Sequence, residues 1–218
     1  MTLSIVACPG QGSQTAGFLG SWLTEVQGFR SELEKLSSAS GLDLVSLGTT
    51  ADDAQIKNTA IAQPLIVASS IAAYRTLFVT TSVRGVLGHS VGEFAAAAIA
   101  GVISDSDAMR LVVIRANAMA NAAAEHPTSM AAILGGDPSE VALTVAEMGL
   151  QIANHNGAGQ LVAAGEKSQI AALIASPPVK SRVIELKVAG AFHTHYMDTA
   201  RHELAEAVKE VEVLDPIM

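Results

Sequence analysis

Apolar and polar positions in the first 126 residues alternate between short apolar runs and longer segments of helical pattern. The runs Ile5–Cys8 and Val83–Leu87 end at glycine-containing turns, which is typical of buried strands. Helices are expected at 29–38, 65–78, 94–100 and 104–124. Residues 41–47 are expected to be the exit from the helix at 29–38, and Pro64 suits the first turn of the helix that continues through 65–78. Strands separated by helices predict an α/β fold with a parallel sheet.

The pattern changes after Pro127, where short apolar runs predict strands at 130–134, 150–153, 161–164 and 182–188. Helical stretches at 138–148 and 168–174 lie between them, and the resulting order β-α-β-β-α-β is ferredoxin-like. We therefore expect a ferredoxin-like subdomain at 127–190, inserted into a main domain formed by 1–126 and 191–218. In that domain Asp198–Val211 is an expected helix. Glu212–Met218 is expected to begin another strand, so the main domain is expected to lack its C-terminal part.

Composition narrows the class of protein. Half of the 218 residues are hydrophobic, 16% are charged, and the formal net charge of −8 argues against nucleic acid as a partner. No apolar run is long and clean enough to span a bilayer, and Met1–Ile5 has no basic region of a secretory signal. The single cysteine, Cys8, lies in an apolar run and fits a reducing cytoplasm. No Cys/His spacing predicts a metal site.

The segment Gly88–Gly92 (GHSVG) has the G-x-S-x-G spacing of a nucleophile elbow, and it lies between a predicted strand and a predicted helix. Such a turn exposes the Ser90 hydroxyl beyond the strand end, and the N–H groups that begin the helix face any oxyanion formed there. An ordinary glycine turn with an incidental serine is the alternative. Because of this elbow, we expect the main domain to have an α/β-hydrolase-like fold.

A serine hydroxyl needs a base within hydrogen-bond reach. His193 is the preferred candidate because it follows the last strand of the predicted subdomain, where the chain returns to the main domain. A histidine held only by its own loop is the alternative. His89 adjoins Ser90, but neighbouring side chains at an elbow diverge. The remaining histidines are His126, His155, His195 and His202.

Basic residues stand out at two places. Arg115 interrupts a helix that is apolar on most sides, and a buried arginine needs a partner. That partner is either an internal acid or the carboxylate of a ligand, which a guanidinium binds through two parallel hydrogen bonds. Lys180, Arg182 and Lys187 form a local basic group, either solvated residues around a strand or a docking site for an acidic partner.

Several separated motifs together resemble the malonyl-CoA:acyl-carrier-protein transacylase family, which also supplies the acyltransferase domains of polyketide and fatty-acid synthases. They run in order along the whole chain, and they are Pro9–Gln14, Thr59–Pro64, Gly88–Glu93, Arg115, Met130–Ala132, Ala153–Gln160 and Phe192–His193.

The resemblance implies a role for each matching residue. Ser90 is the nucleophile, His193 the general base, and Arg115 the group that binds the malonyl carboxylate. The main-chain N–H groups of Gln11 and Val91 are implied to form the oxyanion hole. Further residues implied to bind substrate are Gln63, His89, Asn156 and Phe192. In the family, Phe before the base accompanies malonyl, because its ring occupies the space of an α-methyl branch.

The implied reaction is a ping-pong transfer of malonyl from malonyl-CoA, through an ester on Ser90, to the phosphopantetheine thiol of acyl carrier protein. It needs no bound cofactor. Two alternatives stay open at this point. A serine esterase or thioesterase would use the same elbow, although a hydrolase of neutral esters has no need of Arg115. Family members are longer than this chain, so a catalytically impaired fragment is the second alternative.

Overall fold

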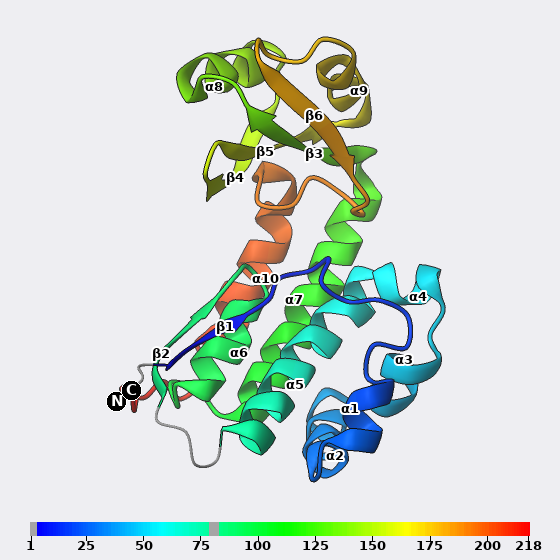
Figure 1. Cartoon of the computed structure of the whole chain (residues 1–218), viewed down its shortest axis with the longest axis vertical. Coiled ribbons are helices and arrows are strands. Elements are labelled where there is room, and N and C mark those ends of the chain that lie inside the picture. The colour runs from blue at the N-terminus through cyan, green and yellow to red at the C-terminus, as the bar shows by residue number, and fades with distance from the viewer. Residues whose placement is uncertain (1–3, 79–82) are drawn as a thin grey trace. The chain divides into compact units, whose positions relative to one another are not determined.

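The computed structural model describes residues 4–78 and 83–218, so Met1–Leu3, on which the expected absence of a signal partly rests, lie outside the described residues. The chain forms two compact units (Figure 1). The first contains the residues up to Asn117 together with Glu203–Met218, and the second is Ala118–His202. The predicted insertion, 127–190, lies inside the second unit.

The first unit contains a parallel pair of strands covered by helices. Strand β1 (Ser4–Cys8) pairs with β2 (Val83–Gly88), and Cys8 is opposite Gly88 in the register, so both strands end at the same edge. The helices are α1 (Gly20–Glu25), α2 (Phe29–Ser40), α3 (Leu44–Thr50), α4 (Asp53–Lys57), α5 (Thr59–Leu77), α6 (Gly92–Ile99) and most of α7 (Asp105–Glu125). Helix α6 contacts both strands and α5, which places the end of β2 beside the buried helices (Figure 1).

Helix α5 begins earlier than the sequence predicted. Pro64 was expected in the first turn, but the helix starts at Thr59, and Asn58 caps it by accepting a hydrogen bond from the Ala60 N–H (3.0 Å). A proline inside a helix removes one main-chain hydrogen bond. Here the first turns are buried, Pro64 included, so tertiary packing outweighs the missing bond. The extra turn carries Gln63 on the buried side of the helix.

Two further expectations for this unit were wrong. The segment 41–47 was expected to be only the exit from a helix, but Asp43 caps α3 by accepting from the Ser46 N–H (3.0 Å). Glu212–Met218 is not a strand. The Leu214 N–H donates to the Val102 carbonyl and the Ile217 N–H donates to the Ala100 carbonyl (both 2.9 Å), at the end of α6 and in the loop after it. Two isolated hydrogen bonds to this segment do not form the regular hydrogen-bond ladder of a β-sheet. The predicted cap of α7 is present: Asp107 N–H donates to Ser104 Oγ (3.0 Å).

The second unit contains an antiparallel sheet with the strand order β4-β5-β3-β6. Each predicted strand overlaps one of these four, and two helices lie between them in sequence. Their bounds are β3 (Thr128–Gly135), α8 (Pro138–Glu147), β4 (Gln151–Gly157), β5 (Gln160–Glu166), α9 (Lys167–Ala175) and β6 (Ser181–Leu186). Two interleaved β-α-β units produce this order. The α/β fold with a parallel and an antiparallel sheet is therefore confirmed.

Alternate residues of these strands enter two separate apolar clusters, as a pleated sheet requires. Ala131 and Ile133 pack with α8 and α9 on one side. Met130 packs on the other with the last turns of α7 and with Phe192, which precedes a 3-10 turn (His195–Met197) and α10 (Asp198–Val208). The loop that carries Phe192 and His193 is thus fixed to one face of this sheet.

Candidate active site

The nucleophile elbow has the backbone geometry that its sequence predicts. Ser90 has a φ of +52°, a left-handed conformation that is strained for any residue other than glycine. Both flanking glycines are required by close main-chain approach. A Cβ on Gly88 would lie 2.3 Å from the Glu93 nitrogen, and one on Gly92 would lie 2.3 Å from the Cys8 carbonyl oxygen. The turn therefore holds Ser90 at the end of β2, at the start of α6.

The loop after β1 lies against this elbow. His89 N–H donates to the Cys8 carbonyl (3.0 Å), and a Cβ on Gly10 would meet His89 Nδ1 at 2.5 Å. His89 itself is exposed, whereas Val91 is buried and caps α6. Within the described residues, the main-chain N–H groups of Gln11 and Val91 donate to no carbonyl or side chain. They are available at neighbouring strand ends, where ligands bind in α/β folds.

Four of the predicted residues form one hydrogen-bonded chain. Arg115 Nη2 donates to Ser90 Oγ (3.3 Å), and Arg115 Nη1 donates to Gln63 Oε1 (2.6 Å). Gln63 Nε2 donates in turn to Gln11 Oε1 (3.2 Å), and Gln11 Nε2 donates to Thr59 Oγ1 (3.3 Å). The structure thus brings together the predicted nucleophile, the predicted carboxylate-binding arginine and two glutamines from separate motifs.

The Arg115 guanidinium carries a charge that its surroundings do not neutralise. Its two hydrogen-bond partners are a neutral amide and a hydroxyl, and its Cζ lies 6.0 Å from the centre of the Phe94 ring. No acidic side chain of the described part of the chain lies within ion-pair distance of it. Burial lowers the pKa of Arg115, and the more distant Glu93 raises it only in part. An anion beside Ser90 would be bound by this charge.

The remaining predicted residues belong to the second unit. His193 is exposed and has a φ of +61°, a left-handed conformation that it shares with Ser90, Ala158 and Lys180. Phe192 is buried in the cluster beside β3, and Asn156 is an exposed residue of β4, whose Nδ2 donates to Gln160 Oε1 (3.3 Å). A left-handed backbone at a non-glycine residue such as His193 is strained, and strain of this kind is typical of functional sites because the surrounding structure must enforce it. The roles of these three residues stay predictions.

Sequence reasoning assigned no role to two residues of the first unit. Thr59 ends the chain of hydrogen bonds, and Phe94 lies under the guanidinium. One available signal was the spacing of Thr59 and Gln63, four residues apart and therefore on one face of a helix. The spacing was not used because the sequence predicted that the helix starts only at Pro64, after both residues.

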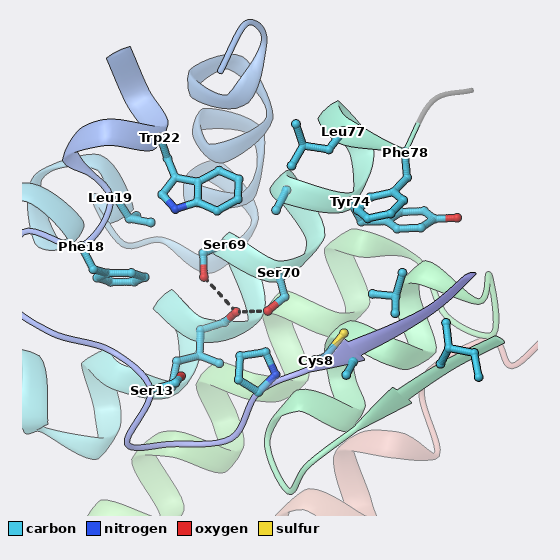
Figure 2. A pocket seen from close by; sticks show the side chains of 16 residues that line it. Cys8, Ser13, Phe18, Leu19, Trp22, Ser69, Ser70, Tyr74, Leu77 and Phe78 are labelled. Carbon is cyan, nitrogen blue, oxygen red and sulfur yellow. Dashed lines mark hydrogen bonds between the residues drawn. The ribbon is translucent and has the colours of Figure 1, made fainter. Parts of the chain in front are cut away.

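A separate apolar pocket of about 440 Å³ lies between β1, α1 and α5. Figure 2 shows its aromatic lining, including Trp22 and Tyr74, and the hydroxyls of Ser69 and Ser70 turned to the carbonyl of Ile66. None of the predicted site residues lines it, so it is not part of this site.

Residues 4–78 and 83–218 contain neither a group of acidic, histidine and cysteine side chains that could hold a metal ion nor a helix long and apolar enough to cross a membrane. Cys8 is free and buried, as predicted.

Comparison with known proteins points to one family. Residues 6–216 match the acyl transferase domain family. The malonyl CoA-acyl carrier protein transacylase of Mycobacterium bovis is 47% identical over 212 residues, which cover 95% of this chain and 70% of the relative. The Escherichia coli protein of the same name is 31% identical, with 97% and 71% covered.

Solved structures agree with the sequence relatives. The crystal structure of MCAT from Mycobacterium tuberculosis superposes with a TM-score of 0.90 at 46% identity, covering 97% of this chain and 71% of the other. A type II polyketide-synthase acyl carrier protein in complex with its malonyl-transacylase gives a TM-score of 0.89 at 29% identity, with 99% and 72% covered.

Proposed function

Because the chain belongs to the acyl transferase family, we propose that it moves a malonyl group from coenzyme A to acyl carrier protein through an ester on Ser90. The observation that carries the choice of acyl group is the 3.3 Å hydrogen bond from Arg115 Nη2 to Ser90 Oγ. An uncompensated positive charge therefore lies beside the atom that would receive the acyl group. Malonyl has a free carboxylate to meet that charge, and acetyl has none.

The substrate carboxylate makes the site selective for malonyl over neutral acyl groups, because only malonyl can neutralise the charge of Arg115. A malonyl group on Ser90 would pair its carboxylate with Arg115 through charge-assisted hydrogen bonds. A neutral acyl group would instead bury the guanidinium without a counter-ion, and leaving a buried charge uncompensated costs roughly 3–5 kcal/mol. Neutral esters are therefore poor substrates, which also distinguishes this site from that of a simple esterase.

The first half-reaction acylates the enzyme. His193 accepts the proton of the Ser90 hydroxyl as the serine oxygen attacks the thioester carbon of malonyl-CoA. The N–H groups of Gln11 and Val91 stabilise the oxyanion, and losing one such donor typically lowers the rate about 10²–10³-fold. The carbon–sulfur bond then breaks, and the coenzyme A thiolate takes the proton from His193.

The second half-reaction reverses these steps with a new thiol. The phosphopantetheine thiol of the carrier gives its proton to His193 and attacks the ester, and Ser90 recovers its proton as the carbon–oxygen bond breaks. No resident cofactor takes part. His89, Asn156 and Phe192 contact substrate, and the Phe192 ring excludes an α-methyl branch.

The acidic carrier would dock on the basic group of the second unit. Lys180, Arg182 and Lys187 are all exposed, and Arg182 lies on β6, at the edge of its sheet. Malonyl-CoA and carrier-bound acyl chains are metabolites of the cytoplasm, which we propose as the location.

Intact-mass measurement after mixing with malonyl-CoA tests the proposal. We expect a malonyl adduct on Ser90 that is stable in water, leaves when carrier protein carrying its thiol arm is added, and is absent from Ser90→Ala. Rapid loss of malonate to water would instead identify a hydrolase. No adduct on the intact chain would identify a catalytically impaired member of the family.

A further inference from the structure

The hydrogen-bond chain that holds Arg115 ends at one threonine hydroxyl in the interior. Thr59 is the first residue of α5, and both Thr59 and Gln63 are only 1% exposed. Gln11 lies between them, accepting from Gln63 Nε2 (3.2 Å) and donating to Thr59 Oγ1 (3.3 Å). Gln11 therefore bridges two residues that are one helical turn apart.

The donor and acceptor groups of these side chains determine the direction of each hydrogen bond between Arg115 and Thr59. Arginine only donates, so the amide oxygen of Gln63 must face Arg115 and its NH₂ group must face Gln11. Gln11 then offers its oxygen to Gln63 and must find an acceptor for its own NH₂ group. The Thr59 hydroxyl oxygen is that acceptor. Without it, the NH₂ group of Gln11 loses its partner, and the orientation of both amides is no longer fixed at this end.

The same residue, Gln11, carries a proposed oxyanion donor on its main chain. It stands between two glycines, and Gly12 has a φ of +111°, so the loop has little stiffness of its own. Side chains hold the loop instead: Gln11 is tied to Thr59, and Gln14 Nε2 donates to the carbonyl of Ile56 (3.1 Å). The position of the Gln11 N–H thus depends on the anchor at Thr59.

We propose that Thr59 is a positioning residue for acyl transfer. Its hydroxyl anchors Gln11, and through Gln11 it sets both the oxyanion loop and the orientation of Gln63 toward Arg115. The inference rests on the proposed malonyl transfer, and Thr59 acts only through these neighbours. Removing the hydroxyl should therefore harm malonyl transfer more than transfer of a neutral acyl group, because only malonyl also needs Arg115.

Three variants test this in the full chain. Thr59→Val removes the hydroxyl at nearly constant volume, Thr59→Ser keeps it, and Thr76→Val removes a hydroxyl of the same helix that donates only within α5 (to Ala72 and Ala73, 2.8 and 3.2 Å). The readouts are the single-turnover rates of Ser90 acylation by malonyl-CoA and by acetyl-CoA, together with the melting temperature.

We expect Thr59→Val to lose about 10-fold or more in malonyl acylation, since displacements of about 1 Å cost up to 10²-fold. The acetyl rate should fall less, so the malonyl-to-acetyl ratio falls, and Thr59→Ser should restore it. Thr76→Val should leave both rates unchanged. An unchanged ratio in Thr59→Val, or equal losses for both substrates with a lower melting temperature, would overturn the inference by showing a purely structural role.

A second route covers the case in which Thr59→Val does not fold. Gln11→Met cuts the same chain from its other side, and it should lower the malonyl-to-acetyl ratio in the same way; an unchanged ratio there overturns the inference. When both variants fold, the double variant should lose no more than the worse single variant, and additive losses would contradict a shared path. If the wild-type chain forms no malonyl adduct, the proposed function fails instead.

Discussion

Two arginines of the first unit face opposite electrostatic situations. Arg75, on α5, donates twice to the Asp105 carboxylate (2.8 and 3.2 Å) and once to the Ala98 carbonyl (3.1 Å). Its hydrogen bonds and charge interaction with Asp105 raise its pKa against the opposing effect of burial. Arg115, on α7, donates to neutral groups, and burial lowers its pKa.

We propose that this difference separates a structural arginine from one that binds a ligand. The charge of Arg75 is already neutralised, and its role is to join α5 to the start of α7. The charge of Arg115 lies next to a strained serine, with its orientation set by Gln63 and without an acid at ion-pair distance in the described structure. A partly buried charge left in this way is costly unless an anion arrives, which is the property that we propose for a malonyl-binding site.

The largest effect is expected when Arg115 is given an acidic partner inside the protein, because this removes the electrostatic difference between the two arginines. Gln63→Glu places a carboxylate where the amide oxygen now lies, 2.6 Å from Arg115 Nη1. The guanidinium would then resemble Arg75, and we expect malonyl acylation of Ser90 to fall about 100-fold while the fold persists. Stopped-flow acylation with circular dichroism checks both parts. Full malonyl activity in this variant would show that Arg115 does not receive the substrate carboxylate.

The converse change removes the acid from Arg75. Asp105→Asn keeps an acceptor but loses the charge, and both side chains of the pair are about a third exposed (33% and 32%). After allowance for solvent screening we expect a loss of about 1–2 kcal/mol in the free energy of unfolding. Denaturant titration measures it, and the malonyl-to-acetyl ratio should stay as in the wild type. A changed ratio would mean that Arg75 also shapes the site.

The smallest effect concerns a buried ionisable group without any charged partner. Burial raises the pKa of Cys8 to about 11 from 9.0, so the thiol stays neutral in the fold while the unfolded chain ionises first. The folded state then binds more protons between these values, and stability falls as pH rises. We expect about 1 kcal/mol less stability at pH 10 than at pH 8 from this group. Cys8→Ala should remove that share of the pH dependence in parallel denaturant titrations; an identical slope in both proteins would contradict it.

Local sequence predicted much of this site because local rules determine it. The glycines around Ser90 are forced by main-chain approaches below 3 Å, so the elbow motif and its geometry coincide. Arg115 was visible as a lone charge in an apolar helix, although the sequence left open whether its partner was an internal acid or a ligand. The partners that the structure shows are neutral, which supports our proposal of a ligand.

Other features depend on tertiary packing that no short pattern contains. Pro64 suggested a helix start, but burial of the first turns extends α5 back to Thr59 and brings Gln63 into the site. Glu212–Met218 has a strand-like pattern, yet it pairs only with a loop. Gln63 was named from family resemblance alone, and Thr59 appeared only as the first residue of a family motif, without a role. His193 as base and Asn156 and Phe192 as substrate contacts stay predictions.

The measurement that bears most directly on Arg115 is the competition of malonyl-CoA and acetyl-CoA for Ser90, read by intact mass in the wild type, Arg115→Ala and Arg75→Ala. We expect Arg115→Ala to lower the malonyl-to-acetyl adduct ratio about 100-fold, through slower malonylation and admission of acetyl, while Arg75→Ala keeps the wild-type ratio. An unchanged ratio in Arg115→Ala, or an equal fall in Arg75→Ala, would contradict a carboxylate site at Arg115.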